Sequence, residues 1–192
     1  MAEDRHLIER AVGSELLLQG HFLRVQRDTV ALPDGQQATR EFIRHPGAVM
    51  VVPLLDDGQL LLERQWRHPL QQVLLEFPAG KLDAGESPLV CGQRELLEET
   101  GYRAREWAHA AWIHNAPGYS DEGLDIWFAR GLLAGPQRLD EGEFIETVAM
   151  SAQALDGLAA RGELTDSKTL VGMLWFHRWS CGAWPLHWQE AG

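Results

Sequence analysis

Short segments with strand-like patterns of hydrophobic and polar residues follow one another along this chain. They predict a hairpin of residues 21–32 and 36–43 around the turn Pro33-Asp34-Gly35, and a second hairpin of residues 48–55 and 59–66 around Asp56-Asp57-Gly58. Four further strands are predicted, at residues 73–77, 105–114, 124–130 and 144–150.

Three segments favour helices instead. Residues 88–100 are rich in helix formers and lie between an N-cap serine, Ser87, and a terminating glycine, Gly101. Two later helices are predicted at 151–161 and at about 166–179, where apolar residues fall on one stripe. Strands that surround one central helix, with the other helices late in the chain, predict an α+β fold or an α/β/α sandwich.

Length and charge limit the possible functions. A chain of 192 residues suits one domain of ordinary size with a small appended sheet, and a formal net charge of -11 argues against binding to nucleic acid or to anionic membranes. No apolar stretch is long enough to span a bilayer. With two cysteines, Cys91 and Cys181, a reducing compartment is expected, and we predict a cytoplasmic protein.

The segment 80–102, GKLDAGESPLVCGQRELLEETGY, carries the candidate chemistry. Helical geometry places Glu95, Glu98 and Glu99 on one face, where their like charges repel unless a cation binds them. Carboxylate oxygens suit Mg2+, for which Mn2+ can substitute. Such a face is otherwise simply solvated, but the complete spacing, with a glycine turn upstream, favours a metal site.

This segment matches the pattern G-x5-E-x7-R-E-U-x-E-E-x-G-U, in which U is a bulky apolar or aromatic residue, and therefore resembles the Nudix box of hydrolases. The resemblance implies an α/β/α sandwich with a mixed β-sheet between helices, preceded by an N-terminal antiparallel β-hairpin or sheet extension. This order of elements is similar to that of the ADP-ribose pyrophosphatase branch of the family. The expected domains are 1–46, an extension that forms a homodimer, and 47–192, the hydrolase domain.

The resemblance also implies an activity, the Mg2+-dependent attack of water on ADP-ribose to give AMP and ribose 5-phosphate. Glu95 and Glu99 would be metal ligands together with the carbonyl of Ala79, and Glu98 would be a ligand or a close catalytic partner. Arg94 would orient the glutamates.

The base is expected outside the box, on the acidic loop before the strand at 144–150. Glu141 is the first choice, and Glu143 is the alternate or an additional metal ligand. The other interpretation is a loop that is acidic only because it is exposed.

Substrate contacts implied by the same branch are more widely spread. Arg67 would reach the phosphates through its fixed fork of donors, and either Arg40 or Arg44 would cross to the partner's site. The segment after the box would wall the nucleotide site with Pro117, Gly118, Tyr119 and Glu122.

Other functions stay open at this stage. The substrate could be GDP-mannose or another nucleoside diphosphate sugar, because the walls of the site set this preference. A nucleoside triphosphate hydrolase fits the N-terminal hairpin and Pro117 less well. From a different class, the protein could be a non-catalytic sensor of nucleotide sugars; against this are the intact carboxylates and the lack of a basic, DNA-binding appendage.

Overall fold

The computed structural model describes residues 4–191 and divides the chain into two compact units. Within the described residues, the first unit consists of 4–46 together with His114–Gly123, and the second consists of Gly47–Ile113 together with 124–191. The first unit thus joins the N-terminal segment to a segment from the middle of the chain. The expected domains, 1–46 and 47–192, stay a prediction.

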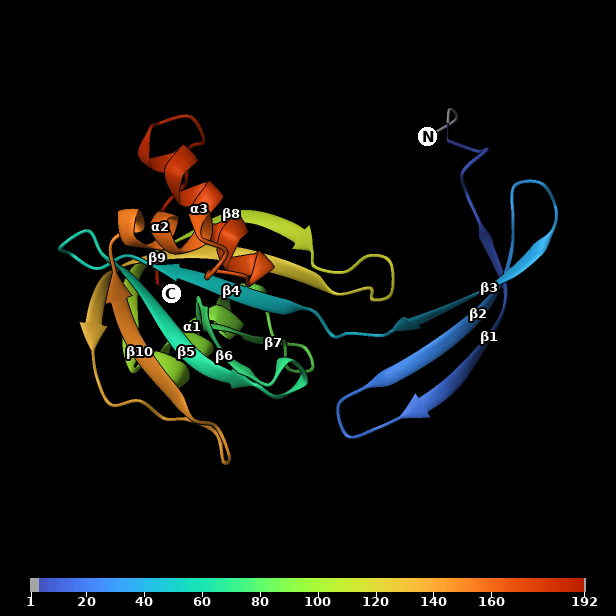
Figure 1. Ribbon diagram of the computed structural model, residues 1–192, viewed down its shortest axis with the longest axis horizontal. Helices are drawn as coiled ribbons and strands as arrows, with labels where there is room; N and C mark the ends of the chain where they lie inside the picture. Colours follow the sequence, from blue (N-terminus) through green and yellow to red (C-terminus); the bar gives the residue numbers. More distant parts are fainter. Residues whose placement is uncertain (1–3, 192) are drawn as a thin grey trace. The chain divides into compact units, whose positions relative to one another are not determined.

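The first unit contains an antiparallel sheet of three strands in the order β1-β2-β3 (Figure 1). Strands β2 and β3 form the predicted hairpin, and the turn between them is closed by Gly35 at φ +88°. Strand β1 was not predicted, because its residues are exposed along the whole strand and show no alternation. The strands are β1 Arg10–Gln19, β2 Arg24–Ala31 and β3 Gln37–Ile43.

The second unit contains two sheets. The larger has five strands in the order β11-β8-β9-β4-β7 and is mixed, since β4 runs parallel to β9 and antiparallel to β7. The smaller has the order β10-β5-β6 and is antiparallel. The strands are β4 Ala48–Pro53, β5 Leu60–Arg67, β6 Gln72–Glu76, β7 Ala79–Lys81, β8 Tyr102–His114, β9 Gly123–Ala134, β10 Ile145–Met150 and β11 Gln189–Glu190.

The predicted hairpin of residues 48–55 and 59–66 is wrong. Both strands exist and a turn joins them at Gly58, but β4 and β5 enter different sheets, and only the bridge between Leu54 and Leu60 links them. The pattern of residues shows where a strand lies, whereas its partner depends on contacts far along the chain.

The helices of this unit are α1 Pro88–Thr100, α2 Ala152–Ala160 and α3 Ser167–Ser180, with a short 3-10 turn, η1, at His68–Leu70. All three helices agree with the predicted ranges to within one residue at each end. Among the described residues no helix is both long enough and apolar enough to cross a membrane.

Strand β4 is buried along its whole length and separates two layers of the core. On one face, a Cβ at Gly92 of α1 would lie 3.2 Å from the side chain of Val49. On the other face, a Cβ at Gly172 of α3 would lie 2.9 Å from the side chain of Met50. Helix α1 therefore covers one face of the sheet and α2 and α3 cover the other (Figure 1), which confirms the predicted α/β/α sandwich.

The segment after α3 folds back onto this unit. The ring of Trp184 lies against Trp175 with centroids 4.5 Å apart, and that of Trp188 lies against Trp179 at 5.9 Å. The chain then adds β11 to the edge of β8. The C-terminal tryptophans thus contribute to the packing of the layer around α3.

Candidate active site

The residues at both ends of helix α1 determine where it begins and ends. The Ser87 hydroxyl accepts a hydrogen bond from the N–H of Val90, Pro88 occupies the first turn, and Gly101 ends the helix at φ +77°. A Cβ at Gly101 would lie only 2.5 Å from the carbonyl oxygen of Gly135, so glycine is required both by conformation and by space. These ends fix where the glutamates of α1 lie.

Arg94 connects the carboxylates of this segment. Its Nε and Nη2 bind both oxygens of Glu86 at 3.0 and 2.9 Å, and its Nη1 binds Glu95 at 2.8 Å and Glu98 at 3.1 Å. Hydrogen bonding to this guanidinium lowers the pKa of Glu86 to about 2. Arg94 is thus hydrogen-bonded to three carboxylates at once.

Glu95 lies directly over the turn that precedes the helix. A Cβ at Gly80 would come within 1.7 Å of the Glu95 Oε1, so only glycine leaves room for this carboxylate. Burial raises the pKa of Glu95, although Arg94 opposes the shift.

Glu99 is the most deeply buried glutamate of the helix, with 5% of its surface exposed. Its Oε2 accepts a hydrogen bond of 3.0 Å from the N–H of Ala79, which brings together the helix and the residue expected to supply a backbone ligand. Burial raises the pKa of Glu99 well above its ordinary value, and the nearby carboxylates of Glu63 and Glu95 raise it further.

Two further glutamates, which the sequence analysis missed, lie on strands β5 and β6. Glu63 and Glu76 are directly opposite each other in the register of these strands and are 0% and 1% exposed. Glu76 is neutralised by Arg67 at 2.7 and 2.9 Å and by Lys168, so its pKa is lowered although burial opposes this. A charged residue inside the apolar runs LLLE and LLEF was the available signal.

Glu63 has a different environment from Glu76. Neither of its carboxyl oxygens has a hydrogen-bond donor among the described residues. Burial, together with the charge of Glu76, raises the pKa of Glu63 to about 8, and an interaction with the carboxyl of Glu99 opposes part of this shift.

Arg67, which was expected to contact phosphate, does not have a free guanidinium in this structure. Two of its nitrogens bind Glu76, and within residues 4–191 only Nη1 is left without a protein partner. A role in binding phosphate would therefore use this one nitrogen.

The acidic loop before β10 is attached to the end of α1. Arg138 donates its N–H to the carbonyl of Glu98 at 2.9 Å, and the Gln137 side chain binds the carbonyl of Glu99. The negative charge of Glu143 contributes to the raised pKa values of both Glu95 and Glu99. Glu141 is exposed in the turn of the loop.

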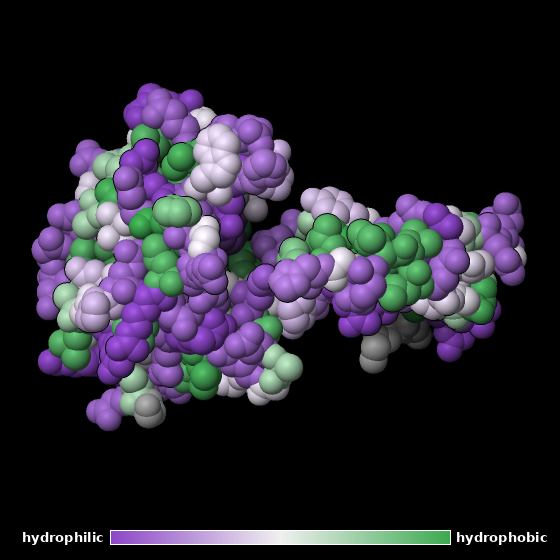
Figure 2. Space-filling view, turned by 90° about the horizontal axis from the view of Figure 1, so that it is seen from below, coloured by the Kyte–Doolittle hydropathy of each residue, from purple (hydrophilic) through white to green (hydrophobic). Residues whose placement is uncertain are grey.

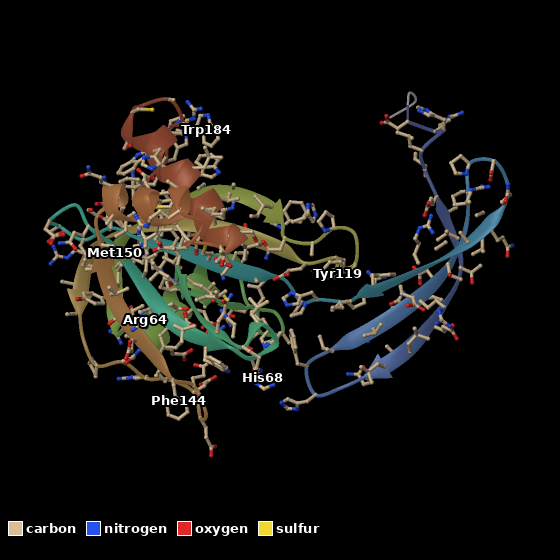
Figure 3. The ribbon with its side chains drawn as sticks, in the orientation of Figure 1. Arg64, His68, Tyr119, Phe144, Met150 and Trp184 are labelled. Carbon is tan, nitrogen blue, oxygen red and sulfur yellow. The ribbon has the colours of Figure 1, made fainter. Side chains whose placement is uncertain are left out.

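The remaining predicted residues lie in the first unit. Arg40 pairs with Glu9, and Arg44 pairs with Asp121 at 2.7 Å. Pro117 and Gly118 lie in a turn in which the Ala116 carbonyl accepts from the N–H groups of two later residues, Tyr119 and Ser120. The side chain of Tyr119, labelled in Figure 3, is 63% exposed, and the Glu122 carboxylate lies 4.0 Å from His45.

The glutamates of α1 fit a hard cation by their chemistry. Within residues 4–191, no group of three or more His, Cys, Asp or Glu side chains is arranged to hold an ion. The hydrogen bonds explain this, because Glu95 and Glu98 are turned toward Arg94 while Glu99 is bonded to Ala79. The donors are nevertheless all oxygens, and burial, together with the charges of neighbouring carboxylates, raises the pKa values of Glu95 and Glu99.

Comparisons with known proteins agree with this arrangement. Residues 44–171 match the model of the NUDIX domain, and residues 9–43 match the model of the nucleoside diphosphate sugar hydrolase N-terminal domain. The chain is 35% identical over 167 residues to the ADP-ribose pyrophosphatase of Bacillus subtilis (strain 168), an alignment that covers 86% of this chain and 90% of that protein. It is 34% identical, with the same coverage, to the methanol dehydrogenase activator of Bacillus methanolicus.

Among solved structures, the crystal structure of an ADP compounds hydrolase has a TM-score of 0.82 and covers 91% of this chain and 95% of that chain. Its sequence identity is 24%, so this likeness concerns the fold. The matched family model spans the helix of glutamates, the turn at Gly80 and both sheets of the second unit apart from strand β11. The chain therefore belongs to the Nudix family of hydrolases.

Proposed function

We propose that this protein hydrolyses the pyrophosphate bond of a nucleoside diphosphate sugar, with ADP-ribose as the first candidate and AMP and ribose 5-phosphate as products. The observation that carries the proposal is the position of Glu95 and Glu99, two largely buried carboxylates beside the turn of Ala79 and Gly80. The Bacillus subtilis relative is named an ADP-ribose pyrophosphatase, and the matched N-terminal model describes nucleoside diphosphate sugar hydrolases. Both support this class of substrate.

The residues proposed to hold a divalent cation are Glu95, Glu98, Glu99 and the carbonyl of Ala79. We propose Mg2+, with Mn2+ as a substitute, because all these donors are oxygens. Such an ion neutralises phosphate charge and lowers the pKa of water. Arg94 contributes by holding Glu95 and Glu98 on the same side of the helix through Nη1, while its Nη2 binds Glu86.

The proposed reaction forms a bond between a water oxygen and one phosphorus, breaks the bridging P–O bond, and transfers the proton of the water to a base. Glu141 is the proposed base, since it is exposed on a loop whose start is attached to α1. Glu143 is assigned to the cation side of the site, because its charge acts on Glu95 and Glu99.

We further propose that two copies of the chain form a homodimer through the first unit. Apolar side chains are exposed on this unit (Figure 2), among them those on strand β1, namely Val12, Leu16, Leu17 and Leu18. Exposed apolar surface of this kind is typical of interfaces between proteins. Arg40 and Arg44 remain the candidates for a contact with the partner's substrate. To make this contact, Arg40 would have to leave Glu9 or Arg44 would have to leave Asp121.

A second candidate function is a non-catalytic sensor of nucleotide sugars. The Bacillus methanolicus relative is named an activator of methanol dehydrogenase, and this name supports a regulatory role. Within the hydrolases, GDP-mannose and other nucleoside diphosphate sugars are the alternative substrates.

The two functions are distinguished by a panel of compounds. Purified protein is incubated with Mg2+ and ADP-ribose, GDP-mannose or ATP, and the products are separated by chromatography. The proposal expects AMP and ribose 5-phosphate from ADP-ribose, and no product when a chelator removes the metal. Binding of ADP-ribose in calorimetry without release of any nucleoside monophosphate would contradict hydrolysis and favour the sensor.

A further inference from the structure

The acidic loop that carries Glu141 and Glu143 comprises residues 135–144, between β9 and β10 (Figure 1). Most of its side chains are exposed. The aromatic side chain of Phe144, labelled in Figure 3, is 84% exposed and does not pack the loop against the rest of the unit. Because little apolar surface of the loop is buried, hydrogen bonds decide where the loop lies.

The turn of this loop is closed by bonds between its own residues. The N–H of Glu143 donates to the carbonyl of Asp140 at 3.1 Å, and the N–H of Asp140 donates to the Oε2 of Glu143 at 3.3 Å. Gly142 lies in the turn at φ +87°, a conformation that glycine adopts without strain. Glu141 lies within the closed turn, so its position follows from the positions of the two ends of the loop.

The first end of the loop caps helix α1. The last carbonyls of a helix have no partner inside it, and the loop supplies donors for two of them. The N–H of Arg138 donates to the carbonyl of Glu98 at 2.9 Å, and the side-chain amide of Gln137 donates to the carbonyl of Glu99. A Cβ at Gly101 would lie only 2.8 Å from the backbone nitrogen of Gln137, so the loop begins directly against the end of the helix.

The same amide of Gln137 reaches the other end of the loop. Its Nε2 makes a long hydrogen bond of 3.4 Å to the carbonyl of Ile145, the first residue of β10. Ile145 is 8% exposed and pairs with Gln65 on β5, so this end is held by the sheet. An amide carries two N–H donors, and one side chain can therefore bind both carbonyls. Gln137 thus joins the helix of glutamates to both ends of the acidic loop.

We propose that Gln137 is a positioning residue for hydrolysis, whose side-chain amide ties both ends of the acidic loop to the end of α1 and thereby holds Glu141 in reach of the substrate. The inference rests on the proposed function, because it takes Glu141 as the base. It requires no contact between Gln137 and the substrate or the cation. Such a tie affects the rate because a displacement of about 1 Å in a catalytic group can cost about 100-fold.

The test is Gln137→Met in the full-length protein, which keeps an unbranched side chain of similar length and removes both N–H donors. Steady-state kinetics use the compound of the panel that the wild type hydrolyses. We expect kcat to fall by about tenfold or more, and KM to stay within about twofold of the wild type. Hydrogen exchange of the metal-free protein, followed by mass spectrometry, should become faster in residues 138–144 and stay unchanged in the core strands.

The matched control is Gln59→Met, in the turn between β4 and β5. The amide of Gln59 also donates a hydrogen bond within a loop, to Asp57 at 3.2 Å. This variant should change neither kcat nor the exchange of the acidic loop.

Combination with Glu141→Gln separates positioning from a general loss of stability. If Gln137 acts through Glu141, Q137M should lower kcat by no more than about twofold in a protein that already lacks the base. A substitution that only loosens the fold would lower kcat by the same factor in both backgrounds.

Three results would overturn the inference. If kcat of Q137M equals that of the wild type, the amide does not position the base. If the loss caused by Q137M persists in full in E141Q, Gln137 does not act through Glu141, and if the loop exchanges at the same rate in Q137M and the wild type, the amide does not hold the loop. Failure of the proposed function has another signature, in which the wild type itself releases no nucleoside monophosphate from any compound of the panel, and this result removes the inference together with the function.

Discussion

Glu141 and Glu143 stand two residues apart on one loop, yet their surroundings differ. The charge of Glu143 helps to raise the pKa values of Glu95 and Glu99 on α1. Glu141 is exposed in the turn, and its charge is not among the causes of these raised pKa values. On this difference we base the proposal that Glu143 belongs to the cation site and that Glu141 approaches the substrate.

We expect Glu141→Gln to lower kcat by about 10^2- to 10^4-fold, the range typical of a lost general base, with unchanged affinity for Mn2+. Glu143→Gln should instead weaken Mn2+ binding, and its activity should recover in part at high metal concentration. Steady-state kinetics and calorimetry on both variants provide the check. The opposite assignment would follow if Mn2+ affinity fell in E141Q and stayed constant in E143Q.

Gly80 gives a second prediction at this scale. In Gly80→Ala the new Cβ would lie 1.7 Å from the present position of Glu95 Oε1, so the carboxylate must move away from the turn. We expect hydrolysis to fall by about tenfold or more, since misplaced catalytic groups cost this much or more, while circular dichroism shows a folded protein.

The matched control is Gly157→Ala on α2, where a Cβ would meet only the flexible end of Arg161 at 3.3 Å. It should leave activity unchanged and stabilise the helix slightly. Equal activity of G80A and wild type would show that Glu95 does not act from its position over this turn.

Glu63 on β5 contributes to the pH dependence that we expect of the metal-free protein, in the same direction as Glu99 on α1, whose pKa is also raised. The folded protein keeps a proton on Glu63 up to a pKa of about 8, whereas the unfolded chain releases it near 4.5. The contribution of this group to stability is therefore complete below about 4.5 and is lost as the pH rises toward 8.

Urea unfolding of the metal-free protein at several pH values between about 5 and 8 measures this slope. The free energy of unfolding should decrease with rising pH in the wild type, and the decrease should be smaller in Glu63→Gln, which has no proton to lose. A slope that is the same in both proteins would mean that Glu63 does not titrate in this range.

The elements also show what local sequence can and cannot predict. Helix α1 was placed at its observed bounds because its signals are local: a serine cap, a proline in the first turn and a glycine that ends it. The pairing of β4 and β5 was predicted wrongly because a pattern along one strand carries no information about its neighbour. Strand β1 was missed because none of its residues is buried.

The same distinction applies to the site. Glu95, Glu98 and Glu99 were found because one helix turn brings them together, and their spacing is visible in the sequence. Glu63 and Glu76 approach α1 and α3 only after the sheets form, so their partners could not be predicted from neighbouring residues. The roles assigned to the glutamates of α1, to Arg67 and to the loop glutamates stay predictions.

At the scale of the whole molecule, charge gives a further reason for a metal. The chain has 28 acidic and 17 basic residues and a formal net charge of -11, yet the proposed substrate is an anion. Several of its cations are already used, since Arg94 binds Glu86, Glu95 and Glu98 while Arg67 and Lys168 bind Glu76. A divalent ion would supply the missing positive charge at the site.

Assembly is the second property of the whole molecule that can be tested. We expect the chain of 21.6 kDa to sediment as a dimer, and Leu16→Glu on the exposed face of β1 to sediment as a monomer because it places a charge in the interface. The control is Leu133→Glu on β9, which is 49% exposed, close to the 53% of Leu16. A wild-type monomer, or a Leu16→Glu dimer as stable as the control, would exclude the proposed interface.

The most direct test of the central claim is the rate of AMP release from ADP-ribose as a function of Mg2+ concentration, in the wild type and in Glu99→Gln. If the carboxylates of α1 bind the cation that activates hydrolysis, release by the wild type will require Mg2+. The E99Q variant, folded as judged by circular dichroism, will lose about 100-fold or more of the rate. Turnover by E99Q close to the wild-type rate at saturating Mg2+, or wild-type release that continues in a chelator, would contradict the account.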